Sequence, residues 1–168
     1  MKKLLLAAIC MGAIVMTEAQ QLRTPQPSTT QTVKQDFGLG GIELSYSRPN
    51  MKGRKIFGDL VPFDKVWRTG ANEATVFEVS KDVTVEGKAL KAGKYALFSI
   101  PGEKEWVIIF NKKSNQWGAY DYKESDDALR VTVPAKAGAL TEKFTITAEN
   151  SGKVTLAWDK AVVAFNVK

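Results

Sequence analysis

Apolar and polar residues alternate with a period of two along most of the chain beyond residue 40, the pattern of strands with one buried face. Turn-forming pairs such as Glu86-Gly87 and Pro101-Gly102 separate these runs where hairpins need them. No window keeps the period of a helix for more than about two turns. The alternation predicts strands over residues 42–47, 74–80, 83–85, 95–100, 106–111, 129–133, 143–148, 154–158 and 162–167. We therefore expect an all-β fold, a single antiparallel β-sandwich of jelly-roll-like form.

The same alternation predicts which side chains face the core. Polar residues such as Thr145 and Thr147 occupy the opposite positions, as a sheet with one solvated face requires. The predicted inward sets are Trp106, Ile108 and Phe110, then Phe144, Ile146 and Ala148, then Val154, Leu156 and Trp158. We expect these residues to build the core and give them no functional role.

Residues 48–75 interrupt the alternation and form a long connection between the first predicted strands. Loops of this length in small domains tend to be functional or disordered. Large apolar side chains indicate that this one packs against the domain: Phe57, Leu60, Val61, Phe63 and Trp67.

The first 19 residues have the organisation of a signal peptide. Two lysines precede an apolar run over residues 4–15, and a small-x-small motif ends at Ala19. The run is too short for a permanent transmembrane helix, which needs about 20 residues. We expect export to the periplasm or the extracellular space, with cleavage near Ala19 and no transmembrane segment. A lipid anchor on Cys10 is the disfavoured alternative, because Ile9 precedes it where such sites need a small residue.

Residues 20–35 are rich in Gln, Thr, Pro and Ser and contain few large apolar side chains. Such a segment buries too little surface to offset its ordering entropy, so a flexible leader is expected. Residues 36–168 then form a single domain, whose length is sufficient for one hydrophobic core.

The composition excludes several classes of function. The chain has no histidine, and Cys10 is its one cysteine, so it cannot build a Ser-His-Asp or Cys-His arrangement or a His-ligated metal site. The net charge is +6, but the lysines are scattered among acids, so we expect no nucleic-acid partner. The acidic residues of 121–127 lack the spacing of a recognised calcium loop. We expect no cofactor or metal and name no catalytic residue, and the oligomeric state stays open.

Four stretches resemble one known family. They are the run over residues 47–75, the run Gly87 to Pro101, and Glu105-Trp106 with Gln116-Trp117-Gly118-Ala119-Tyr120. These stretches are similar to the bacterial domain of unknown function 2911 family, exported proteins of Bacteroidetes type. The resemblance covers about residues 36–168 and implies no activity and no catalytic residues, because the family has none established.

Arginine is concentrated in the long connection. Of the five arginines in the chain, Arg48, Arg54 and Arg68 lie within it, whereas lysine serves nearly everywhere else. Arginine is preferred where a planar, bidentate donor binds a carboxylate or phosphate. The alternative is structural, with Arg68 paired to Glu73, or Arg48 to Asp59, so that the ion pairs hold the loop.

The candidate ligand-binding residues follow from this concentration. Gly70 permits an unusual backbone conformation, and Asn72 offers both a donor and an acceptor, so a tight turn could gather polar groups at one point. A second candidate is the aromatic segment 116–122, whose rings could stack on a sugar or cap the end of the domain. The complete predicted set is Arg48, Arg54, Trp67, Arg68, Asn72, Glu73, Trp117 and Tyr120.

Three functions compete on these grounds. The leading hypothesis is a non-enzymatic protein that binds a small anionic molecule or a glycan near Arg68, Asn72 and Glu73. The second is a hydrolase that uses two carboxylates facing one cleft. The third is a structural or assembly protein, in which Arg68 only stabilises the fold and its loss costs several kcal/mol.

Overall fold

The computed structural model describes residues 27–38 and 40–168, which form strands and one short 3-10 helix. The strand bounds are β1 Thr29–Phe37, β2 Gly40–Arg48, β3 Ala71–Val79, β4 Val83–Val85, β5 Lys88–Leu90, β6 Gly93–Pro101, β7 Glu105–Asn111, β8 Asp127–Ala148 and β9 Lys153–Asn166. The 3-10 helix η1 covers Glu124–Asp126. The all-β prediction is confirmed.

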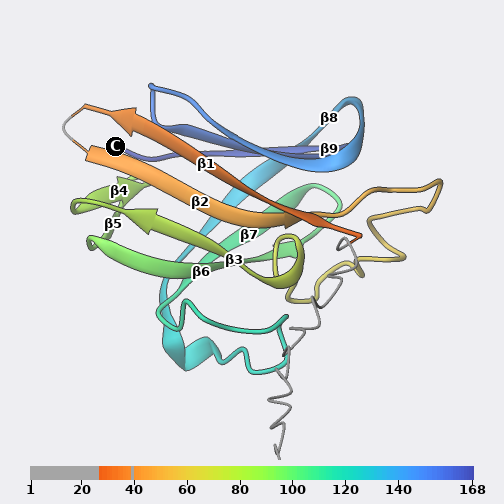
Figure 1. Ribbon diagram of the computed structural model, residues 1–168, viewed down its shortest axis with the longest axis horizontal. Coiled ribbons are helices and arrows are strands. Elements are labelled where there is room, and N and C mark those ends of the chain that lie inside the picture. The colour runs from red at the N-terminus through yellow and green to blue at the C-terminus, as the bar shows by residue number, and fades with distance from the viewer. Residues whose placement is uncertain (1–26, 39) are drawn as a thin grey trace, which may run out of the picture.

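Seven strands form one antiparallel sheet in the order β1-β2-β3-β6-β7-β8-β9, while β4 and β5 form a separate small hairpin. The sheet curves into a half-barrel, so that the β8–β9 hairpin lies beside β1 and β2 (Figure 1). Register shifts within β8 and β9, between Ala137 and Thr145, mark irregularities of the kind that bend long strands. The seven main strands thus form one continuous curved sheet, and the predicted two-sheet sandwich of jelly-roll-like form is not confirmed.

Hydrogen bonds between β2 and the second half of β8 draw the two ends of the sheet together. The Tyr46 hydroxyl donates to the carbonyl oxygen of Ile146 at 3.2 Å and accepts from the Ile146 amide at 2.8 Å. Beyond β2, the backbone amide of Met51 donates to the carbonyl of Glu142 at 2.8 Å. These contacts place the start of the long connection against β8.

The concave side of the sheet holds the main core. All of the predicted inward residues of 106–110, 144–148 and 154–158 are buried except Ala148, which is half-buried against the same cluster. A smaller apolar cluster lies on the other face, where Ala74, Ala96, Phe98 and Ile109 are covered by partly buried side chains that include Tyr122. The prediction of the core from alternation is therefore confirmed.

The flexible leader predicted over residues 20–35 is wrong for residues 29–35, which belong to β1 and pair with β2. Thr, Gln and Lys occupy most of this strand, and only Val33 and Phe37 pack on the core, so the apolar signal was weak. The signal peptide over 1–19, its cleavage near Ala19 and the leader over 20–26 lie outside the described residues. Within the described ranges, no helix has the length and apolar character needed to cross a membrane.

Some predicted strands merge. Residues 129–133 and 143–148 are parts of β8, and residues 154–158 and 162–167 fall largely within β9. The short strand β5 was not predicted. The long connection lies between β2 and β3. Its packing is confirmed for Phe57, Val61 and Trp67, whereas the prediction is wrong for Leu60, which is 44% exposed.

Candidate functional site

Trp67 anchors the end of the long connection to the sheet. Its backbone amide donates to the carbonyl of Ser99 at 2.7 Å, and the Ser99 amide returns a bond to the Trp67 carbonyl at 2.9 Å. The indole Nε1 donates to the carbonyl oxygen of Gly70 at 3.1 Å, and the ring stacks on Trp158 with centroids 5.9 Å apart. The predicted ligand-binding residue Trp67 is thus mainly a core residue, only 9% exposed.

The turn after Trp67 contains backbone conformations that are uncommon for these residue types. Thr69 is fully buried with φ of 53°, an outlier for a β-branched residue. Its hydroxyl lies 2.9 Å from the hydroxyl of Ser99, and its carbonyl accepts from the Thr75 hydroxyl at 2.6 Å. Strained residues of this kind persist where surrounding contacts determine them, often at functional sites. The turn therefore fixes the backbone of Arg68, whose carbonyl accepts from the Thr75 amide at 3.1 Å.

A pocket of about 520 Å³ opens between the long connection and β9, and we call it the arginine pocket. It brings together two of the predicted site arginines, Arg54 and Arg68, with Lys52. The described residues that line it include no aspartate or glutamate. They are Pro27, Ser28, Pro49, Asn50, Lys52, Arg54, Leu60, Val61, Trp67, Arg68, Gly70, Ala71 and Trp158. Three cationic side chains and no lining carboxylate among the described residues favour a positive potential in this pocket, although Glu142, outside the lining, accepts from the Lys52 backbone amide at 2.8 Å.

The guanidinium of Arg68 has unused bonding capacity. Its Nε is buried and has no hydrogen-bond partner among residues 27–38 and 40–168. A buried donor without a partner costs about 1–3 kcal/mol, and no protein contact among the described residues uses this nitrogen of Arg68. The predicted ion pair between Arg68 and Glu73 is absent from the ion pairs of the described residues, as is the pair of Arg48 with Asp59.

Arg54 is held in place by the loop itself. Its Nε donates to the carbonyl of Met51 at 2.9 Å, and Nη2 donates to the carbonyl of Asn50 at 2.7 Å. Both acceptors are uncharged, so these bonds orient the guanidinium without neutralising it. The arrangement presents a positioned positive charge at the pocket wall.

Two predicted site residues have structural bonds instead. Arg48 donates from Nε to the carbonyl of Phe144 at 2.9 Å and from Nη2 to the hydroxyl of Thr145 at 2.7 Å, which ties β2 to β8. Asn72, with φ of 59°, donates its amide to the Ser47 hydroxyl at 3.1 Å and to the carbonyl of Ser28 at 3.3 Å. Neither residue lines the arginine pocket.

The segment around Trp117 runs beside the start of β3. Glu73 and Trp117 form a β-bridge, and the Gly118 amide donates to the carbonyl of Asn72 at 3.2 Å. Glu73 lines a different pocket, whose described lining has no second carboxylate. Trp117 and Tyr120 are 59% and 81% exposed, unusually high fractions for such large aromatic residues.

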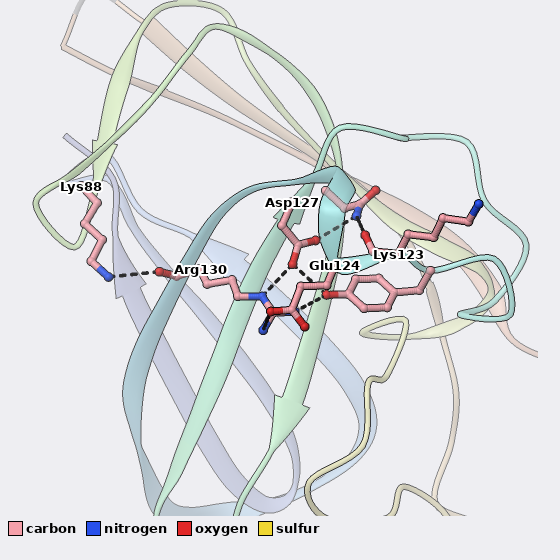
Figure 2. Close-up of polar contacts among 7 residues, drawn as sticks. Lys88, Lys123, Glu124, Asp127 and Arg130 are labelled. Atoms are coloured by element: carbon pink, nitrogen blue, oxygen red, sulfur yellow. Dashed lines mark hydrogen bonds and ion pairs between the residues drawn. The ribbon is translucent and has the colours of Figure 1, made fainter.

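A polar cluster on the other side of the same loop was not predicted (Figure 2). Asp127 accepts on Oδ2 from the Tyr122 hydroxyl at 2.7 Å and from Arg130 Nε at 2.6 Å, and on Oδ1 from Asn111 at 2.9 Å. Arg130 also donates to the Tyr122 hydroxyl and pairs with Glu124 at 3.1 Å. Because these groups form hydrogen bonds and ion pairs with one another, the cluster holds the 112–126 loop against the sheet. The sequence offered no signal for it beyond the spacing of Asp127 and Arg130.

Burial raises the pKa of Tyr122 to about 12, and the hydrogen bond donated to Asp127 acts in the same direction. The hydroxyl therefore stays protonated at neutral pH and serves as a donor. The acidic residues of 121–127 do not converge on a cation site: among the described residues, no group of three or more Asp, Glu, Cys or His has a metal-binding arrangement.

Lys52, Asn50 and Trp158 line the arginine pocket although the sequence did not single them out for binding. Trp158 lies in a run that alternates like a core strand. Nothing in the nearby sequence indicates that it contacts a loop some ninety positions earlier. Lys52 is one of many scattered lysines.

Comparison with known proteins gives one match. The sequence model of a family described as "Protein of unknown function (DUF2911)" matches residues 28–167. No curated protein and no solved structure matches the chain. The resemblance noted in the sequence is confirmed over nearly the whole chain.

Proposed function

The chain belongs to this family of proteins of unknown function, and we propose that it binds a small organic anion in the arginine pocket. One observation carries the proposal: three cationic side chains line the pocket, no carboxylate lines it among the described residues, and the buried Nε of Arg68 lacks a partner there. Arginine favours carboxylate or phosphate oxygens, which it binds through two parallel hydrogen bonds.

The remaining lining suits the carbon skeleton of such a ligand. Trp67, Trp158, Leu60 and Val61 contribute apolar surface beside the cations. Small-molecule sites generally combine apolar walls with a few placed polar groups, in pockets of about 300–1,000 Å³. A volume of about 520 Å³ falls within that range. The ligand is therefore an anion with a sugar-sized or ring-sized body.

The alternatives have less support. A carboxylate-based hydrolase needs two acids across one cleft. The described lining of the arginine pocket contains none, and in the pocket lined by Asp36, Glu43 and Glu78 two of the three acids form ion pairs with Lys34 and Lys94. A purely structural role for Arg68 needs partners, and among the described residues its side chain forms no ion pair or hydrogen bond with any acid. We expect Arg68→Gln to change the free energy of unfolding by less than about 1 kcal/mol without ligand, because no ion pair is broken.

Thermal unfolding tests the proposal with matched pairs of anions and neutral analogues at constant ionic strength. The pairs are glucuronate with glucose, and benzoate with benzyl alcohol, with inorganic phosphate added alone. A binding anion at a hundred times its Kd should stabilise the protein by about 2.7 kcal/mol. The neutral analogues should give no comparable shift.

Arg68→Gln should abolish the shift, and Arg68→Lys should reduce it, because lysine retains the charge but loses the bidentate geometry. Lys81→Gln is the charge-matched control, since Lys81 is exposed and does not line the pocket. The proposal fails if no anion raises the melting temperature, or if Arg68→Gln responds like the parent protein. A loss of several kcal/mol in ligand-free Arg68→Gln would instead support the structural hypothesis.

A further inference from the structure

The exposed aromatic segment adjoins the arginine pocket through a single glycine. A Cβ added to Gly118 would lie 2.9 Å from the ring of Tyr120 and 3.3 Å from Nη1 of Arg68. The side chains of Tyr120 and Arg68 therefore both lie close to the Cα of Gly118, whose φ is 66°. The missing side chain at Gly118 brings the cation of the pocket and the outer aromatic ring together.

Trp117 immediately precedes this glycine and is the one exposed tryptophan of four. Trp67, Trp106 and Trp158 are 9%, 3% and 2% exposed, whereas Trp117 is 59% exposed. An aromatic side chain of this size normally buries most of its surface, so its exposure beside a polar pocket indicates a surface for contact.

We infer that the anion in the arginine pocket is the acidic unit of an oligosaccharide, and that neighbouring sugar units of the chain pack on Trp117 and Tyr120. This inference rests on the proposed function and extends it from a small anion to a chain of sugars. The carboxylate of a uronic acid fits the bidentate donor of Arg68. The apolar faces of pyranose rings fit exposed aromatic rings, and the Tyr120 hydroxyl offers a hydrogen bond at its edge.

The charges around the aromatic segment favour a sugar chain over a nucleic acid. Glu73 pairs with Trp117 along the backbone, and Asp121 follows Tyr120 directly. A nucleic-acid strand carries a phosphate at every unit and binds through several cations along its path. Here acids adjoin the rings directly, and the cations that line a pocket belong to the arginine pocket. A ligand with a charge at one unit and hydroxyls on the next matches this pattern.

Intrinsic fluorescence and calorimetry test the inference on the full chain. The probes are glucuronic acid, a trimer in which one glucuronic acid is linked to two neutral xylose units, neutral xylotriose and a short oligothymidine. Because Trp117 is the exposed tryptophan, the trimer should shift or quench the emission of solvent-exposed indole, and Trp117→Phe should remove that change. The trimer should bind about tenfold more tightly than the monomer, near the upper value for one added aromatic contact.

Trp117→Ala and Tyr120→Ala should each reduce trimer affinity several-fold and leave monomer affinity unchanged. Leu140→Ala is the matched control, because Leu140 is a large apolar residue that is 62% exposed elsewhere on the surface. Gly118→Ala should weaken both ligands, since its methyl group would meet Tyr120 and Arg68.

The outcomes separate the two proposals. If small anions bind through Arg68 but the trimer gains nothing, or its gain survives Trp117→Ala, the sugar-chain inference is wrong and the anion site stands. Tighter binding of oligothymidine than of the trimer, lost in Trp117→Ala, also overturns it. If neither the monomer nor any other anion binds, the proposed function itself fails.

Discussion

Replacing Asp127 with alanine removes the acceptor at the centre of the cluster in Figure 2. The carboxylate is 8% exposed and receives three hydrogen bonds. Bonds to a charged group contribute about 1.5–3 kcal/mol each when intact. Arg130 is 32% exposed and keeps its contact with Glu124, so solvent offsets part of the loss. We expect Asp127→Ala to lower the free energy of unfolding by about 3 kcal/mol, and Asp127→Asn by about half as much.

Urea unfolding at neutral pH, followed by tryptophan fluorescence, measures this loss. The midpoint should fall while the slope with urea stays constant, because the surface exposed on unfolding is the same. Asp121→Ala is the control: it removes an exposed acid from the same loop and should change stability by no more than about 0.5 kcal/mol. Glu124→Gln should also cost little, because Glu124 is 75% exposed. If Asp127→Ala is no more destabilising than Asp121→Ala, the cluster does not hold the loop.

Three further predictions concern single positions. The pKa of Tyr122 is raised from 10.0 to about 12, so its contribution to stability is complete below pH 10.0 and is lost as the pH rises to about 12. Tyr122→Phe should flatten the curve of unfolding free energy against pH in that window, measured by urea unfolding at each pH. An unchanged curve would contradict the raised pKa. Gly152→Ala should lower the free energy of unfolding by more than about 3 kcal/mol, because the new methyl group would overlap the carbonyl oxygen of Val167. Gly87→Ala is the control: it has a similar positive φ but open surroundings, and should cost only about 1–2 kcal/mol. Asn72→Gly should be more stable than Asn72→Ala by about 1 kcal/mol, because both variants lose the same hydrogen bonds and only alanine is strained at φ of 59°. Equal stabilities would mean that the backbone at residue 72 is not strained.

Alternation predicted the central strands because burial of one face is a local signal. Trp106, Ile108 and Phe110 lie on the core side of β7 as their spacing indicates. The edge strand β1 was missed because an edge strand with few inward apolar residues resembles a polar leader in sequence. The curvature that makes one sheet enclose the core depends on irregularities in β8 and β9, which no short window of sequence specifies.

The candidate site was predicted in part. The concentration of arginine identified the segment, and Arg54 and Arg68 do line one pocket. Arg48 and Asn72 form structural hydrogen bonds to two carbonyls and two hydroxyls of residues distant in the sequence, so no local pattern predicts these partners. Lys52 and Trp158 were missed because only the curved sheet brings the loop and β9 together.

The closing contacts between β2 and β8 also set an order of folding. Five of the six neighbouring strand pairs in the sheet are consecutive in the chain, and three of these are short hairpins, so their contacts form between residues closer in sequence, with a lower entropy cost of loop closure. The bonds from Tyr46 and Arg48 to residues 144–146 instead span 96 to 100 positions. We expect neighbouring strands to pair first and the seam formed by these contacts between β2 and β8 to close last. Weakening the contacts of Arg48 should then accelerate unfolding and leave the folding rate nearly unchanged, which is a low φ-value in stopped-flow kinetics. The seam adjoins the arginine pocket, so the binding site is complete only in the last step of folding.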